Sequence, residues 1–146
     1  MGQQQLLLII LGVIIVGIAV AVGITMFQDN AISASKDAVI NDLVQLSAKA
    51  QQHYRKPVSL AGGGNSYVTL TNDSVGLGKL VSGAFSNNDN GRYRITTAGT
   101  ATAVVLTGTS KTQDTEGKFP QIFMTVTPTG NILSTAGWTG VSVLPN

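Results

Sequence analysis

The side chains that could do chemistry are few and scattered along the chain. His53 is the single histidine and there is no cysteine, so the imidazole and thiolate donors of a typical transition-metal site are missing. Asp114 and Glu116 are close in sequence, but they lie in the polar stretch Thr109–Lys118, which is more typical of surface carboxylates than of an acid–base pair. We therefore predict a protein that is not an enzyme, with no catalytic residue, metal or cofactor, and we expect His53 to be a half-exposed helix residue.

Three polar stretches resemble functional motifs without meeting their requirements. The serines lack a Gly-x-Ser-x-Gly motif. The glycine run in Ala61–Asn65 is not followed by Lys-Ser/Thr, as a phosphate loop would be, and we predict a flexible connector there. The stretch Asn87–Gly91 offers many oxygen ligands for calcium but a single carboxylate and no EF-hand spacing. Its Asn90-Gly91 pair instead predicts a hairpin turn.

Modification and charge add two further expectations. Asn72-Asp73-Ser74 fits the sequon for N-glycosylation, so Asn72 is a candidate glycosylation site. The net charge is +2, with nine bases and seven acids. The bases are scattered, whereas nucleic-acid binding needs a clustered basic surface. We predict neither a nucleic-acid partner nor a small-molecule substrate.

The first third of the chain is strongly apolar. Residues 1–28 contain no charged side chain, and between Leu6 and Phe27 the non-hydrophobic residues are Gly12, Gly17, Gly23 and Thr25. As a helix this run spans about 33 Å, close to the hydrocarbon thickness of a bilayer. No base precedes the run, which fits neither a secretory signal peptide nor a plain signal anchor. Whether Met1 is the mature N-terminus stays open.

The helical pattern continues beyond the apolar run. Apolar residues from Ile32 onward recur on one helical stripe, and Asp37, Asp42, Lys49 and Gln52 lie off it. Because no proline or glycine interrupts residues 28–56 and Pro57 follows, we predict one helix of roughly 54 residues. The residues expected to pack this helix on a sheet are Val39, Leu43, Leu46, Ala50 and Tyr54.

Short strands separated by turns follow Pro57. We predict strands at 92–97, 102–108, 121–127 and 131–134, a further one at 140–144, and a helical turn within 73–82. Trp138 is expected at the core or at a subunit contact. The predicted fold class is α+β, with a long N-terminal helix on an antiparallel sheet. Its parts are an apolar helix (1–28), an amphipathic continuation (29–57) and a β-rich head (58–146).

The N-terminal third resembles the type IV pilin and pseudopilin superfamily. The resemblance lies in MGQQQLLLIILGVIIVGIAVAVGITMF and DAVINDLVQLSAKAQQHYRKP, and in the β-rich architecture that follows. It implies a self-assembling helical homopolymer with hydrophobic helices at its centre and with a processed, methylated N-terminus. The implied partners are a prepilin peptidase and the inner-membrane assembly machinery. The implied location is the inner membrane before assembly and an extracellular filament afterwards.

The sequence departs from this family at one position. Bacterial members carry a glutamate at the fifth mature position, whereas this chain has Gln5, or Leu7 if cleavage follows Gly2. The neutral amides of Gln3, Gln4 and Gln5 are weaker acceptors than a carboxylate. Archaeal relatives also lack the glutamate. A melted stretch of helix, found in many bacterial pilins near a proline, has no proline to cause it here, so we predict a continuous helix.

The resemblance predicts that this chain is a structural filament subunit. A pseudopilin of a secretion system and a membrane-anchored binding module that never polymerises are the alternatives. The residues expected to form the assembly helix are Gln3, Gln4, Gln5, Leu6, Leu7, Ile10, Gly12, Ile14, Gly17, Val20, Gly23 and Phe27.

Overall fold

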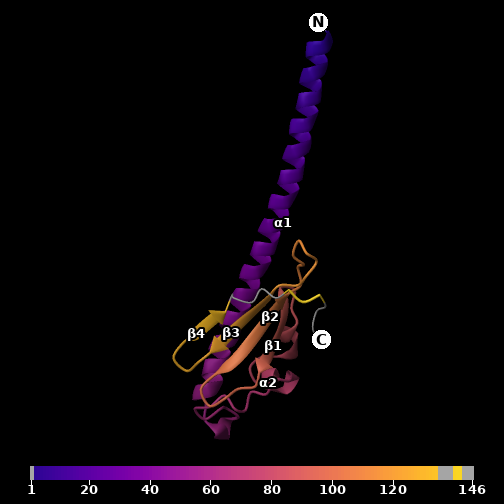
Figure 1. Ribbon diagram of the computed structural model, residues 1–146. Helices are drawn as coiled ribbons and strands as arrows, with labels where there is room; N and C mark the ends of the chain where they lie inside the picture. The colour runs from indigo at the N-terminus through magenta and orange to yellow at the C-terminus, as the bar shows by residue number, and fades with distance from the viewer. Residues whose placement is uncertain (1, 135–139, 143–146) are drawn as a thin grey trace. The chain divides into compact units, whose positions relative to one another are not determined.

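The computed structural model describes residues 2–134 and 140–142. The chain forms two compact units, Met1–Ser33 and Ala34–Asn146. The first unit is helical, and the second combines the last turns of the same helix with a sheet and three short helices (Figure 1). The predicted contacts of Trp138 lie outside the described residues.

Helix α1 runs from Gly2 to Arg55 without a break, which confirms the predicted continuous helix. The glycines at 12, 17 and 23 lower helix propensity by about 1 kcal/mol each, but the Leu, Ile, Val and Ala residues between them tolerate a helix. The helix ends where Pro57, which has no backbone N–H, follows. Its last turn carries Arg55, whose positive charge suits the negative end of the helix dipole.

The glycine run after α1 caps the helix, so the prediction of a flexible connector is wrong. The backbone N–H groups of Gly63, Gly64 and Asn65 donate to the carbonyls of His53, Lys56 and Tyr54 at 2.7, 2.9 and 2.8 Å. These carbonyls have no partner within the helix itself. A Cβ on Gly63 would lie 2.0 Å from the carbonyl oxygen of Ser66. The run contains glycine because the chain folds back this closely.

Four strands form an antiparallel meander in the order β1-β2-β3-β4 (Figure 1). Their bounds are Gly91–Thr97, Val104–Ser110, Gln121–Val126 and Asn131–Ser134. All four were predicted to within about two residues, and the α+β fold class is confirmed. Of the fifth predicted strand only residues 140–142 are described, where Val141 forms an antiparallel bridge with Phe119.

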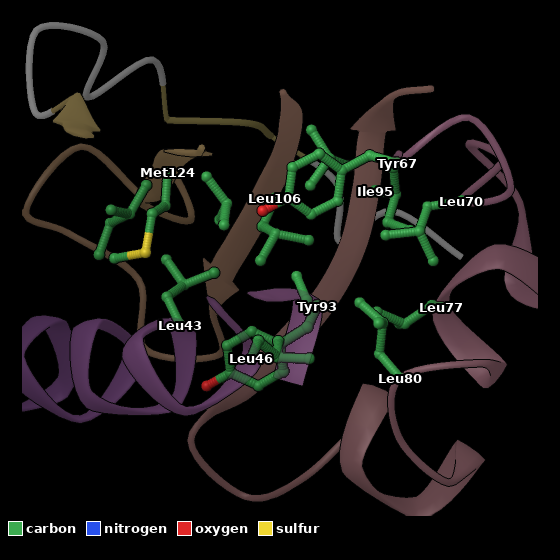
Figure 2. Packing of buried hydrophobic residues seen from close by; sticks show 14 of the residues in the cluster. Leu43, Leu46, Tyr67, Leu70, Leu77, Leu80, Tyr93, Ile95, Leu106 and Met124 are labelled. Carbon is green, nitrogen blue, oxygen red and sulfur yellow. The ribbon is translucent and has the colours of Figure 1, made fainter. Parts of the chain in front are cut away.

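The predicted stripe of α1 forms the helical side of one core. Val39, Leu43, Leu46 and Ala50 are fully or almost fully buried, and Tyr54 is partly buried beside them. Alternate strand residues face them, because successive strand side chains point to opposite faces. The 3-10 helix η1 (Val58–Leu60) and helices α2 (Ser74–Gly78) and α3 (Gly83–Ser86) precede the sheet. Leu77 and Leu80 close the core beside Tyr93 and Ile95, as Figure 2 shows.

Side-chain hydrogen bonds fix the β3–β4 turn to the helix. Gln51 donates from Nε2 to the carbonyl of Thr127 at 3.1 Å and to Oδ1 of Asn131 at 3.2 Å. Asn131 in turn donates from Nδ2 to the hydroxyl of Ser47 at 2.7 Å. The edge strand β4 is thereby held against α1 although its four residues are exposed.

Gly108 in the middle of β2 sets the distance between helix and sheet. A Cβ at this position would lie 2.6 Å from Cγ1 of Val39 and 3.3 Å from Cδ1 of Leu43. Both contacts involve buried residues of α1. The helix therefore packs into the space that a side chain at position 108 would fill.

We predict that Gly108→Ala lowers the free energy of unfolding of the head by about 1–3 kcal/mol, because an overpacked core must shift to admit the methyl group. The measurement is urea unfolding of the full chain in non-ionic detergent micelles. Gly130→Ala is the matched control, since a Cβ there meets no atom within 4 Å. Equal stability of the two variants would contradict the close helix–sheet approach.

Candidate assembly surface

The apolar stretch of α1 is uncovered in the single chain. The large hydrophobic side chains from Leu6 to Phe27 are each between 48% and 75% exposed. They occur on every side of the helix, unlike the one-sided stripe of a helix that packs on its own domain. By length and composition α1 is a candidate membrane span. Such a surface is stable in lipid or against other apolar surfaces.

The three glycines of this stretch lie in open space within the described part of the chain. A Cβ on Gly12, Gly17 or Gly23 would meet nothing within 4 Å, outside the helix's own backbone. In the head, glycines at 62, 63 and 108 lie where a Cβ would clash, whereas those at 78, 83, 117 and 130 are open. Small residues on an apolar helix allow a second helix backbone to approach closely. The open surface at these positions is suited to such a contact.

Polar groups within the apolar stretch of α1 suit an apolar environment, and those in its first turns suit water. Thr25 donates its hydroxyl to the carbonyl of Val22 at 2.9 Å, so this hydroxyl is already satisfied inside its own helix. Gln3, Gln4 and Gln5 are exposed in the first turns of α1. All twelve predicted assembly residues lie in the exposed helical unit.

Asp42 is a buried acid whose burial the sequence pattern did not predict. It lies off the predicted stripe, yet it is only 8% exposed. Its Oδ2 accepts hydrogen bonds from Tyr93 Oη at 2.6 Å, Asn88 Nδ2 at 2.8 Å and Asn90 Nδ2 at 3.0 Å. The Asn-rich stretch is a turn, as predicted, with the Asn88 N–H bonded to the carbonyl of Gly91. This turn is anchored to α1 by one carboxylate.

The hydrogen bonds to Asp42 outweigh the effect of its burial. Burial alone would raise the pKa of the carboxyl, but the donors from Tyr93, Asn90 and Asn88 hold it below its ordinary value of 3.8. Burial and the bond to Asp42 raise the pKa of the Tyr93 hydroxyl far above 10.0, so it stays a donor. The contact is therefore a charge-assisted hydrogen bond at neutral pH.

His53 is buried rather than half-exposed, which corrects the sequence prediction. It is 5% exposed, and its Nε2 lies 2.7 Å from Oγ1 of Thr69. Burial lowers its pKa below 6.5, and the charges of Lys79 and Lys56 act in the same direction. His53 therefore helps to join the end of α1 to the segment before α2.

The remaining candidate residues show local structural contacts. Asp114 Oδ1 accepts the backbone N–H groups of Glu116 and Lys118, each at 2.9 Å. Glu116 pairs with Lys118 Nζ at 2.8 Å on the surface. Within residues 2–134 and 140–142, no group of three or more His, Cys, Asp or Glu side chains could hold a metal ion. Asn72 is exposed, so its sequon is accessible.

No family model, no curated protein and no solved structure matches this chain.

We predict that Asp42→Asn lowers the stability of the head at pH 7 by about 1–2 kcal/mol, because hydrogen bonds to a neutral amide are weaker than those to a carboxylate. It should also flatten the loss of stability in acid. Because the folded-state pKa of Asp42 is lowered, its contribution is complete above its ordinary value of 3.8 and is lost as the pH falls through the folded-state pKa.

The measurement is urea unfolding of the full chain in micelles from pH 7 to pH 2. Asp37→Asn is the matched control, since Asp37 is an exposed acid on the same helix. His53 affects the free energy of unfolding in a different pH range. Because its folded-state pKa is lowered, stability falls as the pH drops below 6.5. An Asp42→Asn variant that keeps the wild-type profile below pH 4 would refute the assigned role of the carboxylate.

Proposed function

We propose that this chain is the structural subunit of an extracellular type IV pilus-like filament, assembled through its apolar N-terminal helix. The observation that carries the proposal is the all-round exposure of the apolar residues from Leu6 to Phe27. A filament of many copies covers every side of such a helix with identical helices. A contact along a single stripe would cover only part of it.

Removal of this apolar surface from water is favourable both in lipid and in a bundle of helices. Burying a Leu, Ile or Val side chain gains about 1.5–3 kcal/mol relative to water, and this stretch has many such residues. The gain from lipid to a helix bundle is much smaller, because lipid tails are as apolar as leucine. The subunit would therefore be stored in the inner membrane and drawn into the filament by an energy-consuming machine. That machine and a prepilin peptidase are the proposed partners.

Two local features support close packing between copies. The glycines at 12, 17 and 23 leave open space where a neighbouring helix can approach. The hydroxyl of Thr25 is satisfied by its own helix, so it can enter an apolar filament centre without an unpaired donor. The amides of Gln3–Gln5 would take the place of the family's glutamate as neutral acceptors near the subunit N-terminus.

We predict that Gly12→Leu together with Gly17→Leu sharply reduces filament number while the protein stays in the membrane. Leucine has a higher helix propensity than glycine by about 0.8–1 kcal/mol per position, so the helix itself is not weakened. The side chains would instead hold neighbouring helices apart. The measurement is electron microscopy of material sheared from cells, with membrane fractionation of the same cells.

Gly83→Leu is the matched control, because it makes the same change at an open position of the head. It should leave filaments and membrane insertion unchanged. Normal filaments from the doubly substituted helix would contradict the proposed packing. If the unsubstituted chain stays in the membrane and gives no filaments at all, the chain is an anchored module instead. A short periplasmic filament would favour a pseudopilin.

A further inference from the structure

The end of the head at which α1 stops carries exposed aliphatic side chains. Val58, Leu60 and Val68 are 69%, 61% and 60% exposed. Val58 and Leu60 belong to η1, which begins three residues after Arg55, the last residue of α1. Single exposed aliphatic side chains are ordinary on a protein surface, whereas neighbouring ones mark a contact site. The position of Val68 relative to η1 is therefore informative.

Contacts with the last turns of α1 bring Val68 to the same end of the head. The residue before it, Tyr67, has its ring centroid 4.8 Å from that of Tyr54. The residue after it, Thr69, has its hydroxyl oxygen 2.7 Å from Nε2 of His53. Because both neighbours are held against the end of α1, Val68 lies there too, at the lower end of α1 in Figure 1.

Basic side chains lie beside these aliphatic ones. Arg55 and Lys56 are exposed and immediately precede η1. Lys79 donates from Nζ to the carbonyl of Thr69 at 2.7 Å, which holds its positive charge next to residue 68. Within residues 2–134 and 140–142, none of these three bases forms an ion pair with a carboxylate. The single acid in the sequence from 43 to 88 is Asp73, so positive charge is in excess here.

We call this group of exposed residues the tip surface; its members are Arg55, Lys56, Val58, Leu60, Val68 and Lys79. The part of α1 that belongs to the head, from Ala34 to Arg55, is about 32 Å long at 1.5 Å per residue. The tip surface therefore lies at the end of the head that is remote from the junction with the apolar unit.

We infer that the tip surface docks on an anionic lipid bilayer. Bases attract the negative surface of such a membrane, and aliphatic side chains between them enter the boundary between headgroups and acyl chains. Neither feature alone is selective, but together they match a surface that is anionic outside and apolar beneath. Single-stranded nucleic acid, the other common polyanion, is bound through aromatic side chains that stack on bases, whereas the exposed apolar side chains here are aliphatic.

This contact differs in kind from assembly through α1. It needs neither the apolar helix nor a second copy of the chain, so it holds for a filament subunit and for an anchored module alike. Each tip surface is small and its contact with lipid is weak. An array of many heads would bind a membrane much more tightly, because each further contact is made at high effective concentration.

The test is capture of protein-free vesicles by the full chain inserted in phosphatidylcholine vesicles, where its apolar helix is already occupied by lipid. Fluorescent acceptor vesicles contain either phosphatidylcholine alone or about one-third phosphatidylserine. We expect capture of the anionic acceptors and at least about tenfold less capture of the neutral ones. Capture of the anionic acceptors should fall steeply as NaCl rises from about 50 mM to about 500 mM, because salt screens the attraction.

Removal of two charges tests the electrostatic part of the contact. Arg55→Gln together with Lys56→Gln should lower capture of anionic vesicles at least about tenfold, since each base near such a surface strengthens binding about fivefold. Lys49→Gln together with Lys111→Gln is the matched control, because it removes two exposed bases outside the tip surface. This control should keep nearly all of the capture.

Removal of two aliphatic side chains tests the apolar part. Val58→Ser together with Leu60→Ser should also lower capture about tenfold, although the net charge is unchanged. Val44→Ser together with Ile132→Ser makes similar changes at positions that are 49% and 64% exposed elsewhere on the head, and should have little effect.

Four outcomes would overturn the inference. They are equal capture of neutral and anionic vesicles by the unsubstituted chain, capture that does not respond to salt, unchanged capture by either double variant of the tip surface, and an equal loss in its matched control. Clustering of the protein-bearing vesicles with one another, without capture of protein-free ones, would also overturn it and would assign the tip surface to a contact between copies.

Discussion

An apolar helix surface that its own chain does not cover is the constraint on which the protein's behaviour depends. The large hydrophobic side chains from Leu6 to Phe27 are each between 48% and 75% exposed, and they occur on every side of the helix. Hydrophobic burial is non-directional and scales with the apolar area removed from water. The stretch must therefore lie in lipid or among other apolar helices. The proposed assembly places it first in the membrane and then among identical helices in the filament.

The head is stabilised by the amphipathic second half of the same helix. The chain has no cysteine, so no disulfide supports a domain of this size. The stripe from Val39 to Ala50 packs directly on the sheet, and Gly108 allows the close approach. Polar contacts then fix the segments around this core. Asp42 anchors the Asn88–Gly91 turn, His53 contacts Thr69, and Gln51 holds the β3–β4 turn.

Most of the fold could be predicted because its signals are local. The apolar run, the stripe beginning at Ile32 and the alternation in Ile122, Met124 and Val126 each reflect one period of side-chain placement. Pro57 marks the end of α1 for an equally local reason. The β-strands were therefore placed to within about two residues without knowledge of their partners.

The errors concern contacts between residues that are distant in sequence. The burial of Asp42 was not predicted, because its three hydrogen-bond donors lie 46–51 residues further along the chain. Burial of His53 depends on the segment that folds back through the glycine run, which was itself misread as flexible. The available signal for the burial of Asp42 was an acid beside the stripe residue Leu43, together with an Asn-rich turn later in the chain.

The most direct test of the central claim is thiol crosslinking between copies along the apolar helix. Because the chain has no cysteine, each single substitution from Leu6 to Phe27 gives one unique reactive site. In material sheared from cells, a short thiol crosslinker should join subunits at positions on more than one side of the helix, because the proposed filament surrounds each helix with identical helices. Val58→Cys, an exposed position of the head, serves as the reference. Monomers at every position of the helix, in protein whose first unit is intact, would contradict the account.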